Sequence, residues 1–177
     1  SLHIQQAIAA YIRTKNAFNS PFDQYMRGDT AALNEDEKNG FNIFMGKAKC
    51  GACHFMPLFN GTIPPAYTET ESEALAVPVK NTTPYIADTD MGKYNFIQST
   101  PYAHAFKTPT LRNIHLTAPY MHNGVYNTMD EVVDFYNGGG GAGLGISSNQ
   151  TLSTEKLHLT PREKEQLVFF MRSLSDN

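Results

Sequence analysis

Tryptophan is absent from this 177-residue sequence, cysteine occurs only twice, and neither sign of charge dominates. The 14 Lys and Arg residues against 17 Asp and Glu give a formal charge of −3, which argues against a nucleic-acid binder that works through phosphate contacts. Long apolar runs are also missing, since the run Ala7–Ile12 is far shorter than the roughly 20 residues of a membrane span. With 41% hydrophobic and 18% charged residues, we expect a soluble globular domain without a membrane span.

The start of the sequence lacks the features of a targeting segment. It begins Ser1-Leu2-His3-Ile4, without an initiating methionine, a basic segment or an apolar stretch. Because position 4 already belongs to a helical pattern, we expect the sequence to begin inside a longer protein.

The two cysteines lie three positions apart and a histidine follows directly, in Cys50-Gly51-Ala52-Cys53-His54. Cys-x-x-Cys-His is the attachment signature of a c-type haem. Two thiols at this spacing can form thioethers with the two vinyl groups of one porphyrin, and the adjacent imidazole then supplies the proximal ligand of the iron. The pattern therefore predicts one covalently bound haem c, with His54 on the iron.

Three other kinds of site use two cysteines at this spacing. A thioredoxin-like redox pair usually lies near a strand–helix–strand pattern, and the sequence has no convincing one. A zinc site needs a second pair of ligands, but the other histidines are scattered, at positions 3, 104, 115, 122 and 158. A disulfide across two residues would be strained and prone to exchange. Thiol redox chemistry and zinc binding stay open as lesser alternatives to haem c.

Apolar spacing predicts a helix on each side of a connection in the N-terminal part. Residues 4–15 repeat apolar side chains at three and four positions, as one face of an amphipathic helix does. Residues 22–29 are interpreted as an ordered connection. A second helix is expected after the N-cap Asn34, where three acidic residues complement the helix dipole, and it runs directly into Cys50. Residues 1–33 are therefore interpreted as a lead-in helix and connection.

Two further helices are predicted in the C-terminal part. Thr128 and Glu131 fit a capping box for a helix over residues 129–137, and the glycines at 138–141 are interpreted as a helix stop and flexible loop. The last helix begins after the N-cap Thr160, and its buried face is expected to consist of Leu167, Phe170, Met171 and Leu174.

Prolines punctuate the middle of the chain. Seven of them fall within residues 56–109 and leave little room for regular helix, so we interpret this stretch as a long loop region that wraps the haem. A helix before the haem signature, loops around the cofactor and a packed C-terminal helix are the minimal plan of a class I cytochrome c. The expected fold is therefore mainly α, with residues 1–177 forming a single cytochrome c-type haem domain.

Three further segments resemble a known family. Residues 106–113 (FKTPTLRN) and 116–124 (LTAPYMHNG) are similar to motifs of the bacterial di-haem cytochrome c peroxidases, which include the MauG-like enzymes. Residues 20–28 (SPFDQYMRG) resemble that family's lead-in to its second haem. Together with the haem signature, these motifs extend over most of residues 4–174.

This resemblance implies a part of a two-haem protein. Family members carry two cytochrome c domains, and the motif order here is similar to that of the C-terminal domain, whose haem relays electrons to a peroxide-reducing haem in the N-terminal domain. The intact protein is then expected to be a periplasmic cytochrome c peroxidase-like enzyme that reduces hydrogen peroxide, and this chain alone to transfer electrons. The implied partners are the missing N-terminal haem domain and a small electron-donor protein, and a homodimer is compatible with the sequence.

The second axial position of the iron has two candidate ligands. The resemblance places Tyr136 there, where ordinary peroxidase members carry Met and MauG-like members carry Tyr. The residues alone favour Met121 first, because a Met in the long segment after the haem signature is the usual cytochrome c ligand. Simple core packing of either side chain, with an open or water-bound iron, is the remaining alternative.

Further site residues follow from the resemblance and from charge. His122 is expected beside the haem or as a hydrogen-bonded core histidine. Arg112 and Lys107 are candidate partners of the haem propionates, with a solvated surface position as the alternative for each. The family also binds one Ca²⁺ between its domains through backbone carbonyls, which correspond here to those of Thr117 and Pro119.

Two other functions remain as alternatives. One is a MauG-like di-haem oxidase that acts on a protein or organic substrate, which Tyr136 as an iron ligand would favour. The other is a simple mono-haem electron carrier. An indole electron relay of the kind used by some family members cannot come from this chain, because it has no tryptophan.

Overall fold

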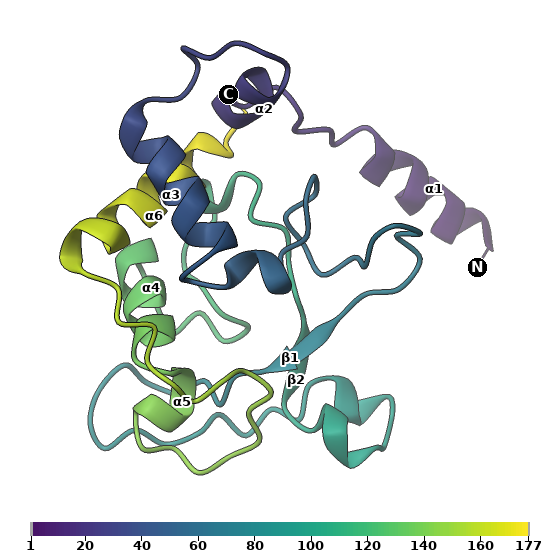
Figure 1. The fold of residues 1–177 in the computed structure, drawn as a ribbon. Coiled ribbons are helices and arrows are strands. Elements are labelled where there is room, and N and C mark those ends of the chain that lie inside the picture. Colours follow the sequence, from purple (N-terminus) through teal and green to yellow (C-terminus); the bar gives the residue numbers. More distant parts are fainter. Residues whose placement is uncertain (1, 177) are drawn as a thin grey trace.

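A computed structural model describes residues 2–176, which contain helices and one small two-stranded sheet (Figure 1). The α-helices in this range are α1 (Leu2–Arg13), α2 (Pro21–Met26), α3 (Glu35–Met45), α4 (Met129–Asn137), α5 (Gly140–Gly143) and α6 (Pro161–Ser173). Among residues 2–176, no helix combines the length and the apolar character that crossing a membrane requires.

Capping residues set the starts of three helices as predicted. The side chains of Asn34, Thr128 and Thr160 accept hydrogen bonds from the backbone N–H three residues later, and an acidic side chain at that position bonds back to each cap. The end of α3 was predicted wrongly. The helix stops at Met45, after which a separate 3-10 turn, η1 (Cys50–Ala52), carries the haem signature.

The segment predicted as a connection contains a short helix, α2. Ser20 is its N-cap, Pro21 occupies the first helical position, and Asp23 completes a capping box with Ser20. This arrangement explains why the chain is ordered here, and it shows that a two-turn helix was overlooked in the prediction.

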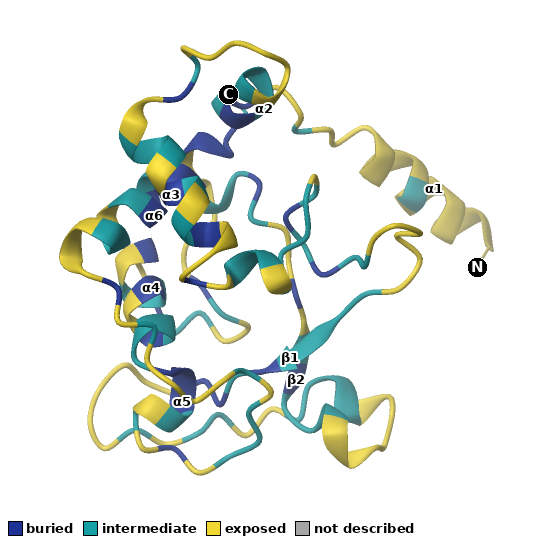
Figure 2. Ribbon diagram, in the orientation of Figure 1, coloured by how far each residue is buried: buried dark blue, intermediate teal, exposed yellow. Residues whose placement is uncertain are grey.

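Helix α1 is amphipathic, as predicted for residues 4–15, but it buries none of its residues against the rest of the described chain. It extends away from the other helices in Figure 1, and Figure 2 shows it almost entirely exposed. Its exposed apolar side chains are Leu2, Ile4, Ile8, Tyr11 and Ile12. Contacts between α1 and residues 14–176 therefore do not explain why this helix has an apolar face.

Residues 56–109 contain no α-helix, as the prolines predicted. Their regular structure consists of two 3-10 turns, η2 (Lys93–Asn95) and η3 (Thr100–Tyr102), and the antiparallel strands β1 (Ser72–Ala74) and β2 (Ala105–Lys107). These strands of three residues were not predicted, because an alternating apolar pattern needs a longer run of residues to be recognised.

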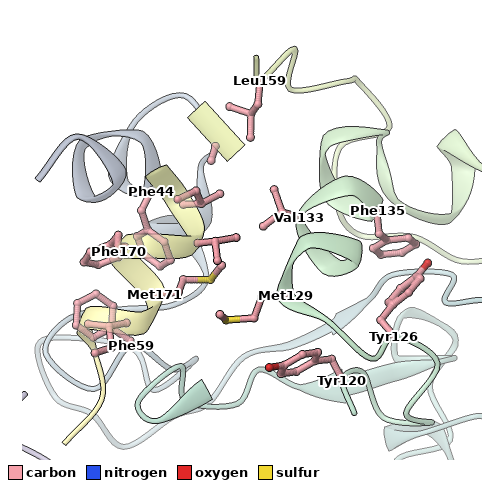
Figure 3. Packing of buried hydrophobic residues seen from close by; sticks show 14 of the residues in the cluster. Phe44, Phe59, Tyr120, Tyr126, Met129, Val133, Phe135, Leu159, Phe170 and Met171 are labelled. Carbon is pink, nitrogen blue, oxygen red and sulfur yellow. The ribbon is translucent and has the colours of Figure 1, made fainter. Parts of the chain in front are cut away.

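The core is built where α3 and α6 cross. The rings of Phe44 and Phe170 lie 5.1 Å apart between their centroids, and Phe59 packs against both. Figure 3 shows this aromatic group on one side, with Tyr126 and Phe135 on the other side of α4. The predicted apolar face of α6 is confirmed, since these four side chains are buried: Leu167, Phe170, Met171 and Leu174.

The glycine-rich segment after α4 is not the flexible loop that was predicted. Gly140–Gly143 forms the single turn α5, whose first two residues are buried. Gly139 precedes it with a φ of +97°, a left-handed conformation that glycine adopts without strain. Gly141 lies so close to Ala76 that a side chain would have no room. The glycines therefore allow this turn to pack closely on the loop region.

Candidate haem-binding site

The haem signature opens onto a cavity of about 810 Å³, in the upper part of the range of ligand sites in proteins. Cys50, Cys53 and His54 line it, and α4 and the segment around Met121 contribute to its other walls. Most of the lining is apolar, and its aliphatic members include Leu75, Val77, Leu111, Val132, Val133 and Leu167. A large apolar ligand with a few polar groups suits such a cavity.

His54 is held in one tautomer. Its Nδ1 lies 3.1 Å from the backbone oxygens of both Phe59 and Pro109, which can only accept, so Nδ1 carries the proton. Burial lowers the pKa of His54, so the ring is neutral near pH 7. The lone pair on Nε2, at the opposite edge of the ring, is therefore available to a metal ion. This is the form in which histidine binds haem iron.

Both cysteines have protonated thiols near neutral pH. Burial raises the pKa of Cys50 to about 12. Burial, together with the nearby carboxylates of Glu73 and Glu71, raises that of Cys53 to about 11. Redox-active cysteines require a lowered pKa, because the thiolate is the nucleophile. The surroundings of these thiols therefore fit thioether attachment better than thiol exchange.

The side chains of residues 2–176 do not form a structural zinc site. Within residues 2–176, the single group of His, Cys and acidic residues whose ligand atoms all lie within 4.8 Å of one another is Cys53, Glu71 and Glu73. This group omits Cys50 and His54, whereas a structural zinc site takes four Cys or His ligands. The donor set that lines the cavity, two thiols and one neutral imidazole, fits haem c.

Both candidates for the second axial ligand line the same cavity as His54. Tyr136 comes from α4, where its ring packs edge-on against Phe135 at 5.5 Å between centroids. Burial raises the pKa of Tyr136, and the neighbouring thiols and Glu73 add to this effect, so the phenol keeps its proton in the absence of a metal. Met121 lies in the loop before α4, with a φ of +68°.

Two more of the predicted site residues lie at the cavity. The ring of His122 stacks on Phe106 with 3.7 Å between centroids, and burial lowers the pKa of His122 although the carboxylate of Asp88 opposes this. Lys107 lines the cavity and donates a weak hydrogen bond from Nζ to the backbone oxygen of Thr108, at 3.3 Å. Lys107 is therefore placed to meet an anionic group of a ligand, and His122 to pack beside one.

Arg112 lies outside the cavity lining, unlike the other predicted residues. Its side chain is only 6% exposed and forms an ion pair with Asp23, with 2.8 Å between Nη2 and Oδ1. The remaining N–H groups donate to Asp23 Oδ2 and to the backbone oxygens of Ala17 and Pro57, so all five donors are used. The structure therefore excludes a solvated surface position for Arg112, whose guanidinium is buried and fully paired.

The two residues expected to bind calcium, Thr117 and Pro119, are among those that line the cavity. Among the hydrogen bonds of residues 2–176, none ends on the backbone oxygen of either residue, so both oxygens are open to another partner. Hard oxygen donors of this kind suit Ca²⁺.

Several residues in and around the site could not be predicted from the sequence, and one that could have been predicted was overlooked. The carbonyls of Phe59 and Pro109 belong to the backbone and have no side-chain signature. Glu73 lies in a strand too short to predict and Glu71 directly precedes that strand, and both lie beside Cys53. Asp23 could have been found, because Ser20-Pro21-Phe22-Asp23 fits a capping box with proline at the first helical position.

Comparisons with known proteins agree with the resemblance drawn from the motifs, although no family model matches the chain. The chain is 35% identical to cytochrome-c peroxidase IdrP2 of Denitromonas iodatirespirans, over 98% of the chain and 49% of that protein. It is 31% identical to the methylamine utilization protein MauG of Methylorubrum extorquens, over 97% of the chain and 44% of that protein.

One solved structure extends the likeness to the fold. A MauG-like protein associated with microbial copper homeostasis matches 90% of the chain and 52% of its own length, with a TM-score of 0.68 and 27% identity. The chain spans about half the length of the curated relatives it matches. Over that half, the chain belongs to the family of bacterial cytochrome c peroxidases and MauG proteins.

Proposed function

We propose that this chain is an electron-transfer domain with one covalently bound haem c, attached through Cys50 and Cys53 and held at the iron by His54. The observation that carries the proposal is the meeting of two protonated thiols and one neutral imidazole at a single apolar cavity of about 810 Å³. Cys50 and Cys53 would each hold the haem through a thioether, with the S–H added across one vinyl group. Attachment therefore needs no oxidant.

The domain is proposed to work within a longer periplasmic di-haem enzyme that reduces hydrogen peroxide. In this account residues 1–177 are one cytochrome c-type domain, the C-terminal of two, and the N-terminal domain carries the peroxide-reducing haem. The proposal is supported by the motif order of residues 106–124 and by relatives that are about twice as long as the chain. A small electron-donor protein supplies the electrons.

Tyr136 is proposed as the second axial ligand, with Met121 as the alternative. The family resemblance supports Tyr136, and so does its place on the cavity wall, on a helix whose start is capped by Thr128 and Glu131. Binding to iron would release the phenolic proton that burial otherwise retains. An anionic oxygen ligand lowers the potential of the iron, which favours the second candidate function, a MauG-like oxidase of a protein or organic substrate.

The remaining assignments concern three other residues that line the cavity. Lys107 is proposed to pair with a haem propionate, because it lines the cavity and its ammonium group has only a weak hydrogen bond of its own. Thr117 and Pro119 are proposed to give their backbone oxygens to one Ca²⁺ shared with the missing domain.

A pair of visible spectra, oxidised and reduced, tests this proposal on protein made together with a c-type haem maturation system. The proposal predicts a c-type spectrum without the weak far-red band that marks a Met–iron bond. Tyr136→Phe should then change the spectrum of the oxidised protein, and Met121→Leu should leave it unchanged. A change in Met121→Leu, with none in Tyr136→Phe, would identify Met121 as the second axial ligand and favour simple electron transfer. A wild-type protein without a Soret band would refute haem attachment and favour thiol redox chemistry or metal binding at Cys50 and Cys53.

A further inference from the structure

Three successive backbone oxygens beside the haem signature are each held by a donor from one short segment. Arg112 donates to the Pro57 oxygen at 2.7 Å from Nη2. The hydroxyl of Thr110 donates to the Leu58 oxygen at 2.6 Å. The amide of Leu111 donates to the Phe59 oxygen at 2.9 Å. We call residues 57–59 and 110–112, joined by these bonds, the carbonyl clamp.

The third of these oxygens is also an acceptor for His54. The Phe59 oxygen lies 3.1 Å from His54 Nδ1, and the Pro109 oxygen at the start of the second segment lies at the same distance. Both carbonyls that hold the imidazole are therefore part of the clamp or directly precede it. Any shift between the two segments would change the position of the acceptors relative to Nδ1–H.

Phe59 reaches this position in a strained backbone conformation. Its φ is +49°, in the left-handed region that a bulky L-residue enters at a cost. Such strain persists only where the surroundings determine the conformation, and it gathers at functional sites. The Leu58 carbonyl belongs to the peptide plane that precedes the Phe59 Cα. The bond from Thr110 to that carbonyl therefore helps to fix the φ of Phe59 and the direction of its own carbonyl.

The clamp is joined to the lead-in segment through Arg112. The same guanidinium that holds the Pro57 oxygen is paired with Asp23 of α2 and bonded to the Ala17 oxygen. The hydroxyl of Thr110 also accepts from the Arg112 amide at 3.2 Å, which ties the two donors together. Residues far apart in the sequence thus converge on the backbone that faces His54.

We propose that Thr110 and Arg112 are positioning residues for the proximal ligand, which set the haem potential by aiming the Phe59 carbonyl at His54 Nδ1. This inference rests on the proposed attachment of haem and on His54 as the iron ligand. A hydrogen bond from Nδ1–H to a carbonyl makes the imidazole more basic and favours ferric iron. Weakening the clamp therefore raises the potential.

Thr110→Val tests the clamp, because valine keeps the shape of threonine and removes its hydroxyl. Thr110 is exposed, so the variant is not expected to prevent folding. Losing one hydrogen bond typically changes an equilibrium constant by a factor of about two to ten. At a fixed potential, we expect the ratio of ferrous to ferric haem to rise by about that factor, and tenfold is 59 mV for a one-electron couple. The measurement is a redox titration of the haem-loaded chain.

Two matched variants separate positioning from general stability. Thr110→Ser keeps the hydroxyl and should restore the wild-type potential. Ser173→Ala removes another hydroxyl-to-carbonyl bond, from buried Ser173 to the Phe170 oxygen at 2.7 Å, and should leave the potential unchanged. Hydrogen exchange of the Leu111 amide gives a local readout, because this amide donates to Phe59. The Leu111 amide should exchange faster in Thr110→Val than in wild type, and at the wild-type rate in Thr110→Ser and Ser173→Ala.

The outcomes distinguish this inference from the proposed function. A normal c-type spectrum with the same potential in Thr110→Val and wild type would overturn the role of the clamp and leave the haem assignment intact. An equal shift in Ser173→Ala would also overturn it, because general loosening would then explain the change. A wild-type chain that takes up no haem would overturn the proposed function, and the inference with it.

Discussion

Substituting Gly40 should destabilise the protein although alanine is the better helix former. Gly40 lies in the interior of α3, where it is buried against α6. A Cβ at this position would lie 2.7 Å from the Phe170 Cβ and also clash with the backbone oxygen of Gln166. Because one of these contacts is backbone, a side-chain rotation cannot relieve the clash. Gly40→Ala therefore forces the two helices apart.

The expected size follows from two opposing terms. Replacing an interior helix glycine by alanine gains up to about 1 kcal/mol of helix propensity. Forcing an extra methyl into a packed contact costs typically about 1–3 kcal/mol, and occasionally more, and a clash with backbone belongs at the upper end. The separation also loosens the ring contacts of Phe44 and Phe170, which lie 5.1 Å apart. We expect a net loss of about 2 kcal/mol.

Urea unfolding of the haem-loaded chain, followed by far-UV circular dichroism, measures this loss. With a slope of about 2 kcal/mol per M, the midpoint should fall by about 1 M. Asn39→Ala is the matched control, because Asn39 is exposed on the same helix and its replacement should be neutral or slightly stabilising. A Gly40→Ala protein as stable as the wild type, beside a neutral Asn39→Ala, would refute the close crossing of α3 and α6.

Three further predictions concern the lead-in segment, α4 and the proposed calcium site. Asp23→Asn leaves a buried arginine without its counter-charge and should cost about 3 kcal/mol in urea unfolding. Burial would raise the pKa of Asp23, but hydrogen bonds from Arg112 and Ser20 outweigh it and hold this pKa below its ordinary value. The ionised Asp23 carboxylate therefore stabilises the fold above about pH 4, and this stabilisation is lost as the pH falls through the folded pKa. The free energy of unfolding should therefore fall less steeply with decreasing pH in Asp23→Asn than in wild type. Thr128→Ala removes the cap of α4 and should cost about 1 kcal/mol, with equal stability as the contrary result. If Thr117 and Pro119 share one Ca²⁺ with a second domain as proposed, calcium should raise the unfolding temperature of a longer two-domain protein more than that of this chain. Calorimetry with and without a chelator measures both shifts, and equal shifts would contradict a shared site.

Local signals predicted the helix starts, whereas one error came from an overlooked local signal and another from long-range packing. The caps Asn34, Thr128 and Thr160 bond within their own first turn, so three or four residues suffice to predict them. The end of α3 was predicted too late, because the stop signal of Gly46, which caps the helix, was overlooked. The turn Gly140–Gly143 was predicted as loop, because its packing against Ala76 involves residues far away in the sequence.

The same division holds for the candidate site. The haem signature is contiguous, so its chemistry could be predicted from five residues. Arg112 was expected near a propionate, but its partner Asp23 lies 89 positions away, and a charge with a distant partner carries no local signal. The acceptors of His54 are backbone oxygens, which any residue could supply. Their role depends on where the loops meet, and sequence patterns do not encode that.

The most direct test of this account is the intact mass of the purified chain after denaturation in acid, on protein made with a c-type haem maturation system. The account predicts the mass of the polypeptide plus one haem, because thioethers at Cys50 and Cys53 survive unfolding. Cys50→Ala together with Cys53→Ala should return the mass of the polypeptide alone. A wild-type chain that loses all added mass on denaturation would contradict covalent attachment, and with it the central claim.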